Sequence, residues 1–106
     1  MISDKEVYNS YLKMFDKLDK YWDLTKDDDL GGLLGSMSPY IFSGGMPIDS
    51  SMYKDWVTIC EVKREAPNNL HNYIIEYLLM QEAKFMLNLS RVINYLNSTA
   101  TPTDTD

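Results

Sequence analysis

The chain has 106 residues, 44% of them hydrophobic and 25% charged, which is typical of one soluble globular domain. Sixteen acidic residues against ten basic ones give a formal net charge of -6, which disfavours nucleic-acid binding because that binding depends on cations at the phosphates. No apolar run approaches the ~20 residues of a membrane span, and the N-terminal residues do not resemble a signal peptide. Because the single cysteine, Cys60, cannot form an intramolecular disulfide, we expect a cytoplasmic protein.

The first predicted helix begins after a capping box. Ser3 is followed three residues later by Glu6, a spacing in which the serine hydroxyl accepts from the backbone N–H of the glutamate. Apolar residues then recur with helical period as far as Trp22, while charged residues occupy the other side. The pattern predicts an amphipathic helix that ends at about Lys26.

A short second helix is predicted from about Asp28 to Ser36. The three aspartates at 27–29 supply an N-cap and negative charge in the first turn. Two glycines, at 31 and 32, each cost roughly 1 kcal/mol relative to alanine in a helix, so close packing has to stabilise it. Beyond this helix, Tyr40-Ile41-Phe42 is interpreted as one short extended piece and residues 43–47 as an irregular turn.

Asp49 is a good N-cap for a third helix, which we expect to run to about Glu65 because Pro67 follows. From Leu70 to Leu96 the apolar positions keep helical spacing without a Pro or Gly, which predicts one long helix or two nearly collinear ones. The apolar arc of this segment is wider than one flat contact needs. Either other helices wrap around it or it meets a second copy of the chain.

These elements predict an all-α fold: a bundle of three to four helices in which the first and last are longest and pack roughly antiparallel. Residues 1–97 form a single helical domain, with the glycine-containing helix and the aromatic turn closing one end. Residues 98–106 have no apolar period and are expected to be a flexible C-terminal tail.

Few residues suit catalysis, and we expect no enzyme, no cofactor and no metal. His71, the only histidine, falls on the first turn of the last helix, where a surface position is expected. Cys60 lies among apolar residues, which tends to make a thiol inert. The aspartates at 27–29 are consecutive, so they point in different directions and suit capping better than cation binding.

An acidic surface with exposed aromatic residues suits a basic protein partner, because charge speeds the encounter and the rings provide buried anchors. The candidate contact residues are the acids of the first helix and of the turn that follows it, together with the exposed edge of the aromatic turn: Asp16, Asp19, Asp23, Asp27, Tyr40 and Phe42.

Four stretches carry a resemblance: YWDLT at 21–25, DDLGGLLGSM at 28–37, Gly45-x-Pro47-x-Asp49 and Asp55-Trp56. Together they resemble small bacterial immunity proteins of polymorphic or contact-dependent toxin systems. The resemblance covers about a third of the chain, and the long apolar segment after Pro67 lies outside it. It implies a helical, non-enzymatic, cytoplasmic protein that binds and neutralises a toxin.

The residues of this motif also have physical roles, which make it mainly a signature of the fold. The acids cap and polarise the short helix, the leucines bury it, two glycines permit close contact, and a tryptophan closes the core over it: Asp28, Asp29, Leu30, Leu33, Leu34, Gly31, Gly35 and Trp56. The sequence therefore predicts an acidic binding protein, with an immunity protein against a basic toxin domain as the first hypothesis. The alternative is a structural or adaptor protein that forms a homodimer through residues 70–96.

Overall fold

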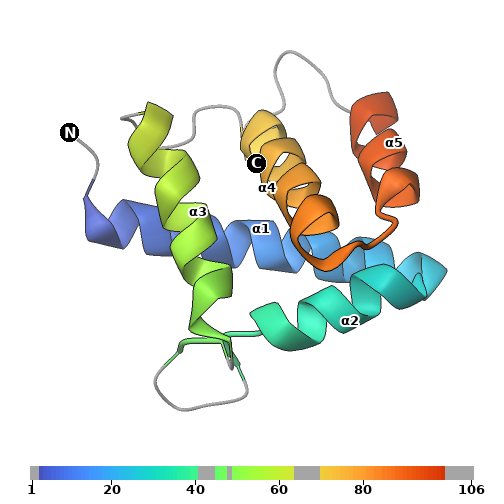
Figure 1. Ribbon diagram of the computed structural model, residues 1–106, viewed down its shortest axis with the longest axis horizontal. Helices are drawn as coiled ribbons and strands as arrows, with labels where there is room; N and C mark the ends of the chain where they lie inside the picture. The colour runs from blue at the N-terminus through green and yellow to red at the C-terminus, as the bar shows by residue number, and fades with distance from the viewer. Residues whose placement is uncertain (1–2, 41–44, 48, 64–69, 100–106) are drawn as a thin grey trace.

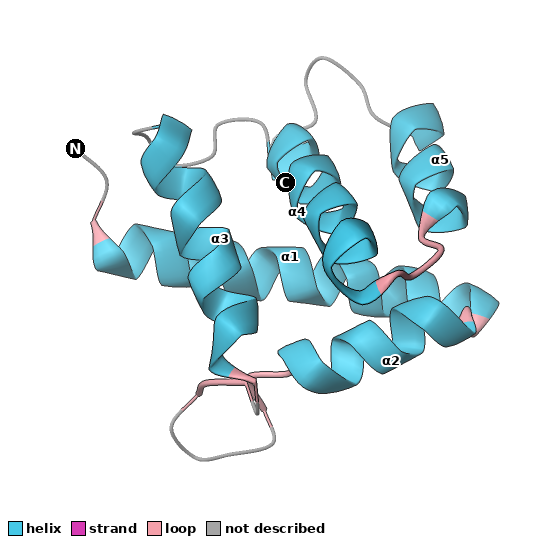
Figure 2. Ribbon diagram, in the orientation of Figure 1, coloured by secondary structure: helices cyan, strands magenta, loops and turns pink. Residues whose placement is uncertain are grey.

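The computed structural model describes residues 3–40, 45–47, 49–63 and 70–99, and this part of the chain is all-helical, without a strand (Figures 1 and 2). The all-α class is confirmed. The described residues form five helices, one more than the upper limit predicted: α1 (Asp4–Thr25), α2 (Asp28–Met37), α3 (Ser50–Lys63), α4 (Leu70–Phe85) and α5 (Ser90–Thr99).

Helices α1 and α2 meet at a sharp elbow whose parts are local in sequence. Helix α1 ends at Thr25 because Lys26 adopts a left-handed conformation (φ 52°) and its N–H donates to the carbonyl of Trp22 at 2.6 Å. The carboxylate of Asp27 then accepts from the N–H of Leu30 at 3.1 Å and begins α2. The chain thereby turns back, and α2 runs beside α1 (Figure 1).

Helices α3, α4 and α5 stand side by side and cross α1 (Figure 1). Helix α3 packs against both α1 and α4, and α5 packs against α4. The prediction that the first and last helices are longest and antiparallel is therefore wrong. Helix α1 has 22 residues but α5 has only ten, and the neighbour that runs beside α1 is α2.

The single or collinear helix predicted over 70–96 is also wrong, because the chain reverses between α4 and α5. Met86 adopts a left-handed conformation (φ 55°), and two carboxylates accept from the turn that follows. Asp29 of α2 accepts from the N–H of Asn88 at 2.7 Å, and Glu82 of α4 accepts from the N–H of Leu89 at 2.6 Å. These bonds satisfy backbone donors that a continuous helix would have paired internally.

The core lies where α1, α3 and α4 meet, around the fully buried Trp56. Its indole N–H donates to the hydroxyl of Ser10 at 2.9 Å, and its rings lie 6.2 Å and 5.7 Å from those of Tyr73 and Tyr77. Trp56 therefore contacts α1 and α4, whereas the sequence suggested that it closes the core over α2. The three leucines expected to bury α2 are buried, as predicted: Leu30, Leu33 and Leu34.

Close contact was expected at two glycines of α2, and it occurs at one of them. A Cβ at Gly31 would lie 2.6 Å from Nε1 of Trp22, so this glycine lets the indole rest on the backbone of α2. At Gly35 the prediction is wrong, because no described atom outside its own surroundings comes within 4 Å of a Cβ there.

Candidate protein-binding surface

Three of the predicted contact acids lie exposed along α1: Asp16, Asp19 and Asp23. Lysines alternate with them on the same helix, and Asp23 forms an ion pair with Lys26 at 3.1 Å. Three of these lysines and one aspartate line a shallow hollow of about 210 Å³: Lys13, Asp16, Lys17 and Lys20. The outer face of α1 therefore carries both charges, so it is a weaker attractant for a cationic partner than its acids alone suggest.

Tyr40 and Asp16, predicted separately as contact residues, lie together. The Tyr40 hydroxyl donates to the Asp16 carboxylate at 3.2 Å, and the Tyr40 ring packs edge-on against Phe15 at 5.6 Å. Partial desolvation, with the negative charge of Asp16 nearby, raises the pKa of Tyr40. The ring remains 62% exposed, so it is available to a partner. Phe42, predicted beside it, lies outside the described residues.

Asp27 is the one predicted contact acid that the structure buries. It is 9% exposed, one carboxylate oxygen caps α2, and the other lies 3.8 Å from the guanidinium of Arg91 on α5. These contacts explain Asp27 as a structural residue, so it does not belong to the exposed acids of the surface.

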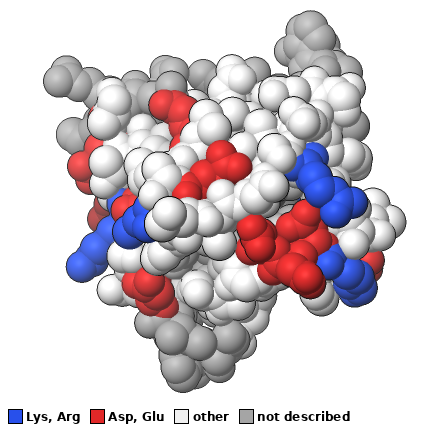
Figure 3. All heavy atoms as spheres, turned by 45° about the vertical axis from the view of Figure 1, so that its right-hand side comes forward, with Lys and Arg blue, Asp and Glu red and all other residues white. Residues whose placement is uncertain are grey.

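A further concentration of acids surrounds a hollow of about 300 Å³ between α2, the start of α3 and the end of α4. We call it the acidic pocket. Three carboxylates stand in its wall, and the rest of the wall is mainly apolar: Asp28, Asp29, Gly32, Leu33, Ser36, Asp49, Met52, Phe85 and Leu87. On the face shown in Figure 3 the acidic side chains gather in separate groups, and the largest of these, on the right, has basic side chains on two of its sides.

Two of the three carboxylates of the pocket accept hydrogen bonds from other parts of the chain. Asp29 accepts from the N–H of Asn88, and Asp49 accepts from the N–H and hydroxyl of Ser51 at 3.0 and 2.7 Å. The hydrogen bonds from the Ser51 hydroxyl and N–H lower the pKa of Asp49. Among the described residues, no lysine or arginine forms an ion pair with any of the three acids.

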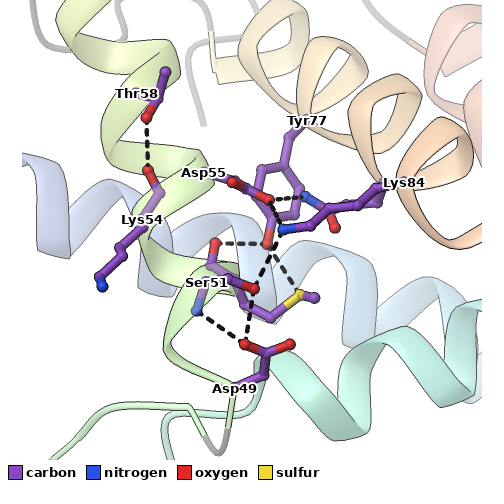
Figure 4. Close-up of polar contacts among 9 residues, drawn as sticks. Asp49, Ser51, Lys54, Asp55, Thr58, Tyr77 and Lys84 are labelled. Carbon is purple, nitrogen blue, oxygen red and sulfur yellow. Dashed lines mark hydrogen bonds and ion pairs between the residues drawn. The ribbon is translucent and has the colours of Figure 1, made fainter.

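One lysine approaches this region, but it pairs with a different carboxylate. Lys84 lies 3.0 Å from Asp55, which also accepts from the amide of Gln81 at 2.9 Å. The same ammonium donates to the hydroxyl of Ser51 at 3.3 Å. Figure 4 shows Lys84 reaching from α4 toward Asp55 and Ser51, with Asp49 beyond them at the foot of α3. This network joins α3 to α4. The Lys84 ammonium also lies over the Phe85 ring at 5.5 Å, and its positive charge helps to lower the pKa of Asp49, so it acts on the acidic pocket as well as on Asp55.

A larger hollow of about 630 Å³ lies at the other end of α3. Its charged residues have mixed signs, with one lysine between two acids, and its remaining wall is aromatic and aliphatic: Asp4, Lys5, Val7, Tyr8, Met46, Tyr53, Val57 and Glu61. The hydroxyl of Tyr8, which lines this hollow, donates to the carbonyl of Gly45 at 2.7 Å. Because the charges oppose one another, this hollow has less preference for a cation than the acidic pocket.

The residues considered for catalysis lie inside the molecule. Cys60 is fully buried, and burial raises the pKa of its thiol to about 11, which makes the reactive thiolate rare. His71 is 8% exposed, so the surface position expected for it is wrong.

No family model matches the chain, and no curated protein or solved structure matches it either. In the described ranges no group of three or more His, Cys, Asp or Glu residues could hold a metal ion. No helix among these residues is long and apolar enough to cross a membrane.

Sequence reasoning found the acids of the pocket but assigned them only to capping. Asp28 and Asp29 belong to the first turn of α2, and Asp49 precedes α3, as their positions in the sequence predicted. What it missed is that the α4–α5 turn brings Phe85 and Leu87 to the same place. No local signal could have shown this, since these residues are more than 30 positions from Asp49.

Proposed function

We propose that this chain is an acidic binding protein that acts in the cytoplasm and neutralises a basic bacterial toxin domain by covering it. The observation that carries the proposal is the combination of a net charge of -6 with exposed aromatic and aliphatic side chains beside carboxylates. Tyr40 over Asp16 and Phe85 beside the acidic pocket are the two examples. Such a surface favours fast encounter with a cationic partner and then offers it apolar anchors.

The resemblance to immunity proteins supports the same proposal and adds the kind of partner. Its motif residues Asp28 and Asp29 lie in the wall of the acidic pocket, while its leucines are in the core. A non-covalent blocker of ordinary interface size, about 1,600 Å² in total, needs no catalytic group of its own.

The test is inhibition of a candidate toxin encoded by a gene next to this one. We expect the purified chain to abolish the toxin's activity at an equimolar ratio and to form a complex with it by size-exclusion chromatography. An unrelated helical protein with the same net charge is the matched control, because it separates specific binding from general attraction of opposite charges. A toxin that stays fully active with excess chain would contradict the proposal.

A second candidate, a self-associating structural or adaptor protein, is favoured by one specific observation. Three apolar residues of α4 and the turn after it are exposed: Leu79 (50%), Phe85 (42%) and Met86 (92%). A homodimer through this region would cover them. Sedimentation equilibrium decides the matter, because a monomer at tens of micromolar excludes this candidate and a dimer that Met86→Glu disrupts supports it.

A further inference from the structure

We infer that the connection between α2 and α3 presents Tyr40 and Met46 to the basic partner, and that tyrosine hydroxyls of α1 hold this connection in position. The inference rests on the proposed function and names the part of the surface that performs it. The site consists of the two described arms of the connection, residues 38–40 and 45–47, which Figure 2 shows as loops between the end of α2 and the foot of α3.

Two tyrosines of α1 bind the backbone at the start of the first arm and on the second arm. Tyr11, which is fully buried, donates to the carbonyl of Met37 at 2.7 Å, where α2 ends. Tyr8 donates to the carbonyl of Gly45 at 2.7 Å. Both distances are typical of a good O–H···O hydrogen bond. A carbonyl at a helix end or in a loop has no partner within a helix, so these hydroxyls take that role and tie the arms to α1.

The contact between Tyr8 and Gly45 depends on glycine for two separate reasons. Gly45 has a φ of 73°, a backbone conformation that residues with a side chain rarely adopt. A Cβ at this position would also lie only 2.5 Å from the Tyr8 hydroxyl oxygen. The dihedral angle and the available space therefore both fit the hydrogen bond that fixes the second arm.

A third tyrosine, Tyr53 of α3, orients the two donors. Its ring lies 5.9 Å from that of Tyr8 and 5.2 Å from that of Tyr11, edge-on in both cases. This is an arrangement that aromatic pairs prefer. Because a tyrosine hydroxyl lies in the plane of its ring, a ring that is held in place also fixes the direction of the hydroxyl. The three rings therefore support the arms from the side of α1 and α3.

Each arm carries one large exposed side chain. Tyr40 is 62% exposed and Met46 is 44% exposed, and the hydroxyl of Tyr40 is itself bound to Asp16. Tyrosine and methionine are enriched at protein interfaces, and tyrosine is frequent among the residues that contribute most to binding. Because the arms are ordered before the partner arrives, less conformational entropy is lost on binding.

The charges beside the arms are mixed, so they do not supply the selectivity. Asp16 shares its hollow with lysines of α1, and the hollow that Met46 lines contains one lysine and two acids. The net charge of -6 still speeds the encounter with a basic partner. We therefore expect most of the binding free energy at this site to come from the two exposed side chains.

The first experiment tests the positioning and needs no toxin. Tyr8→Phe keeps the ring beside Tyr53 and removes only the hydroxyl, and Tyr95→Phe removes a hydroxyl from α5 as the control. Backbone ¹⁵N relaxation gives the order parameters of Gly45 and Met46. We expect values near about 0.85 in the parent chain and in the control, and values lower by at least about 0.1 in Tyr8→Phe. Unchanged order parameters in Tyr8→Phe overturn the inference.

The second experiment measures the affinity for the candidate toxin. We expect Tyr40→Ala and Met46→Ala each to weaken binding at least about fivefold. Leu24→Ala is the matched control, because Leu24 is 76% exposed and lies at the other end of α1, and it should stay within about twofold of the parent. All variants are first checked for native helical content by circular dichroism. Binding as tight as that of the parent in both alanine variants overturns the inference.

A double-mutant cycle separates positioning from a general loss of stability. Tyr8→Phe should weaken toxin binding by about threefold to tenfold in the parent chain, because a smaller fraction of molecules has the second arm in place. In the Met46→Ala background the same change should cost less than about twofold, since the side chain that it positions is gone. Equal losses in both backgrounds overturn the inference while the proposed function survives. If the parent chain does not inhibit the toxin, the proposed function fails, and the relaxation data still decide whether Tyr8 holds the second arm.

Discussion

Alanine at Gly35 is expected to stabilise the protein. Gly35 lies in α2, is exposed, and leaves open space where a Cβ would be. Glycine within a helix is less favourable than alanine by about 0.8–1.0 kcal/mol, because it loses more backbone entropy on folding. We therefore expect Gly35→Ala to raise the free energy of unfolding by about 0.5–1 kcal/mol, with the lower value applying because the site is near the end of the helix.

The same change at Gly31 is the matched control, since the two glycines share one helix but not one environment. A Cβ at Gly31 would be 2.6 Å from Nε1 of Trp22, whereas ordinary contact begins at 3.4 Å. The indole would have to move by about 0.8 Å, although Lys26 lies over it at 4.0 Å. Crowding of this kind costs about 1–3 kcal/mol, which offsets the gain in helix propensity.

Urea unfolding followed by circular dichroism measures both variants. We expect Gly35→Ala to be more stable than Gly31→Ala by about 2 kcal/mol, without a change in the m-value. In thermal unfolding, 1 kcal/mol corresponds to about 4–8 °C in a domain of 60–100 residues. Equal stabilisation by the two alanines would refute the argument, because it would show that the contact between Trp22 and α2 does not restrict position 31.

Two further predictions concern capping and pH. Asp27→Ala should lower the free energy of unfolding by about 1–2 kcal/mol because α2 loses its N-cap. Arg91→Ala should lower it by less than about 1 kcal/mol because the guanidinium is exposed. Comparable losses for the two variants in urea unfolding would contradict this order. Burial raises the pKa values of Tyr11, Tyr77 and Cys60, the last to about 11, so these groups ionise first in the unfolded chain. The free energy of unfolding should be constant near pH 8 and fall above about pH 9, by up to about 1.4 kcal/mol per pH unit for each group. A free energy of unfolding that stays constant up to about pH 11 would refute this assignment.

Much of the fold could be predicted because its signals are local. Two predicted helix caps appear in the structure as hydrogen bonds. The Ser3 hydroxyl accepts from the N–H of Glu6, and the Asp49 carboxylate accepts from the N–H of Ser51. The boundary between α1 and α2 was predicted within a residue or two because the aspartates at 27–29 combine a break with a cap. In these places the residues that decide the structure are neighbours in the chain.

The reversal between α4 and α5 could not be predicted for the opposite reason. Periodicity alone favours a continuous helix through Met86, a residue whose left-handed conformation is unfavourable for its side chain. The turn is stabilised by a residue that is distant in the sequence: the Asp29 carboxylate accepts a hydrogen bond from the N–H of Asn88, 59 positions away. The one local signal is Asn88 two residues before Ser90, where the amide oxygen accepts from the Ser90 N–H at 3.1 Å.

The sequence predicted which types of residue form the candidate site, but it did not predict which of them come together in the fold. The acids of α1 were chosen from the polar side of one helical stripe, and the sequence gives no means of seeing that Tyr40 would bond Asp16. The acidic pocket needs α2, the start of α3 and the end of α4 at once. Because its wall is formed only when these elements pack, periodicity within any one of them cannot reveal it.

The bond between Asp29 and Asn88 also bears on the order in which the molecule is assembled during translation. Ribosomes release the N-terminal half first, so α1 and α2 can already be docked when the segment beyond residue 85 emerges. We therefore expect the Asp29 carboxylate on α2 to be in place before the Asn88 amide that it binds in the folded chain. A circularly permuted gene that starts at α3 would reverse this sequence of events and should fold more slowly.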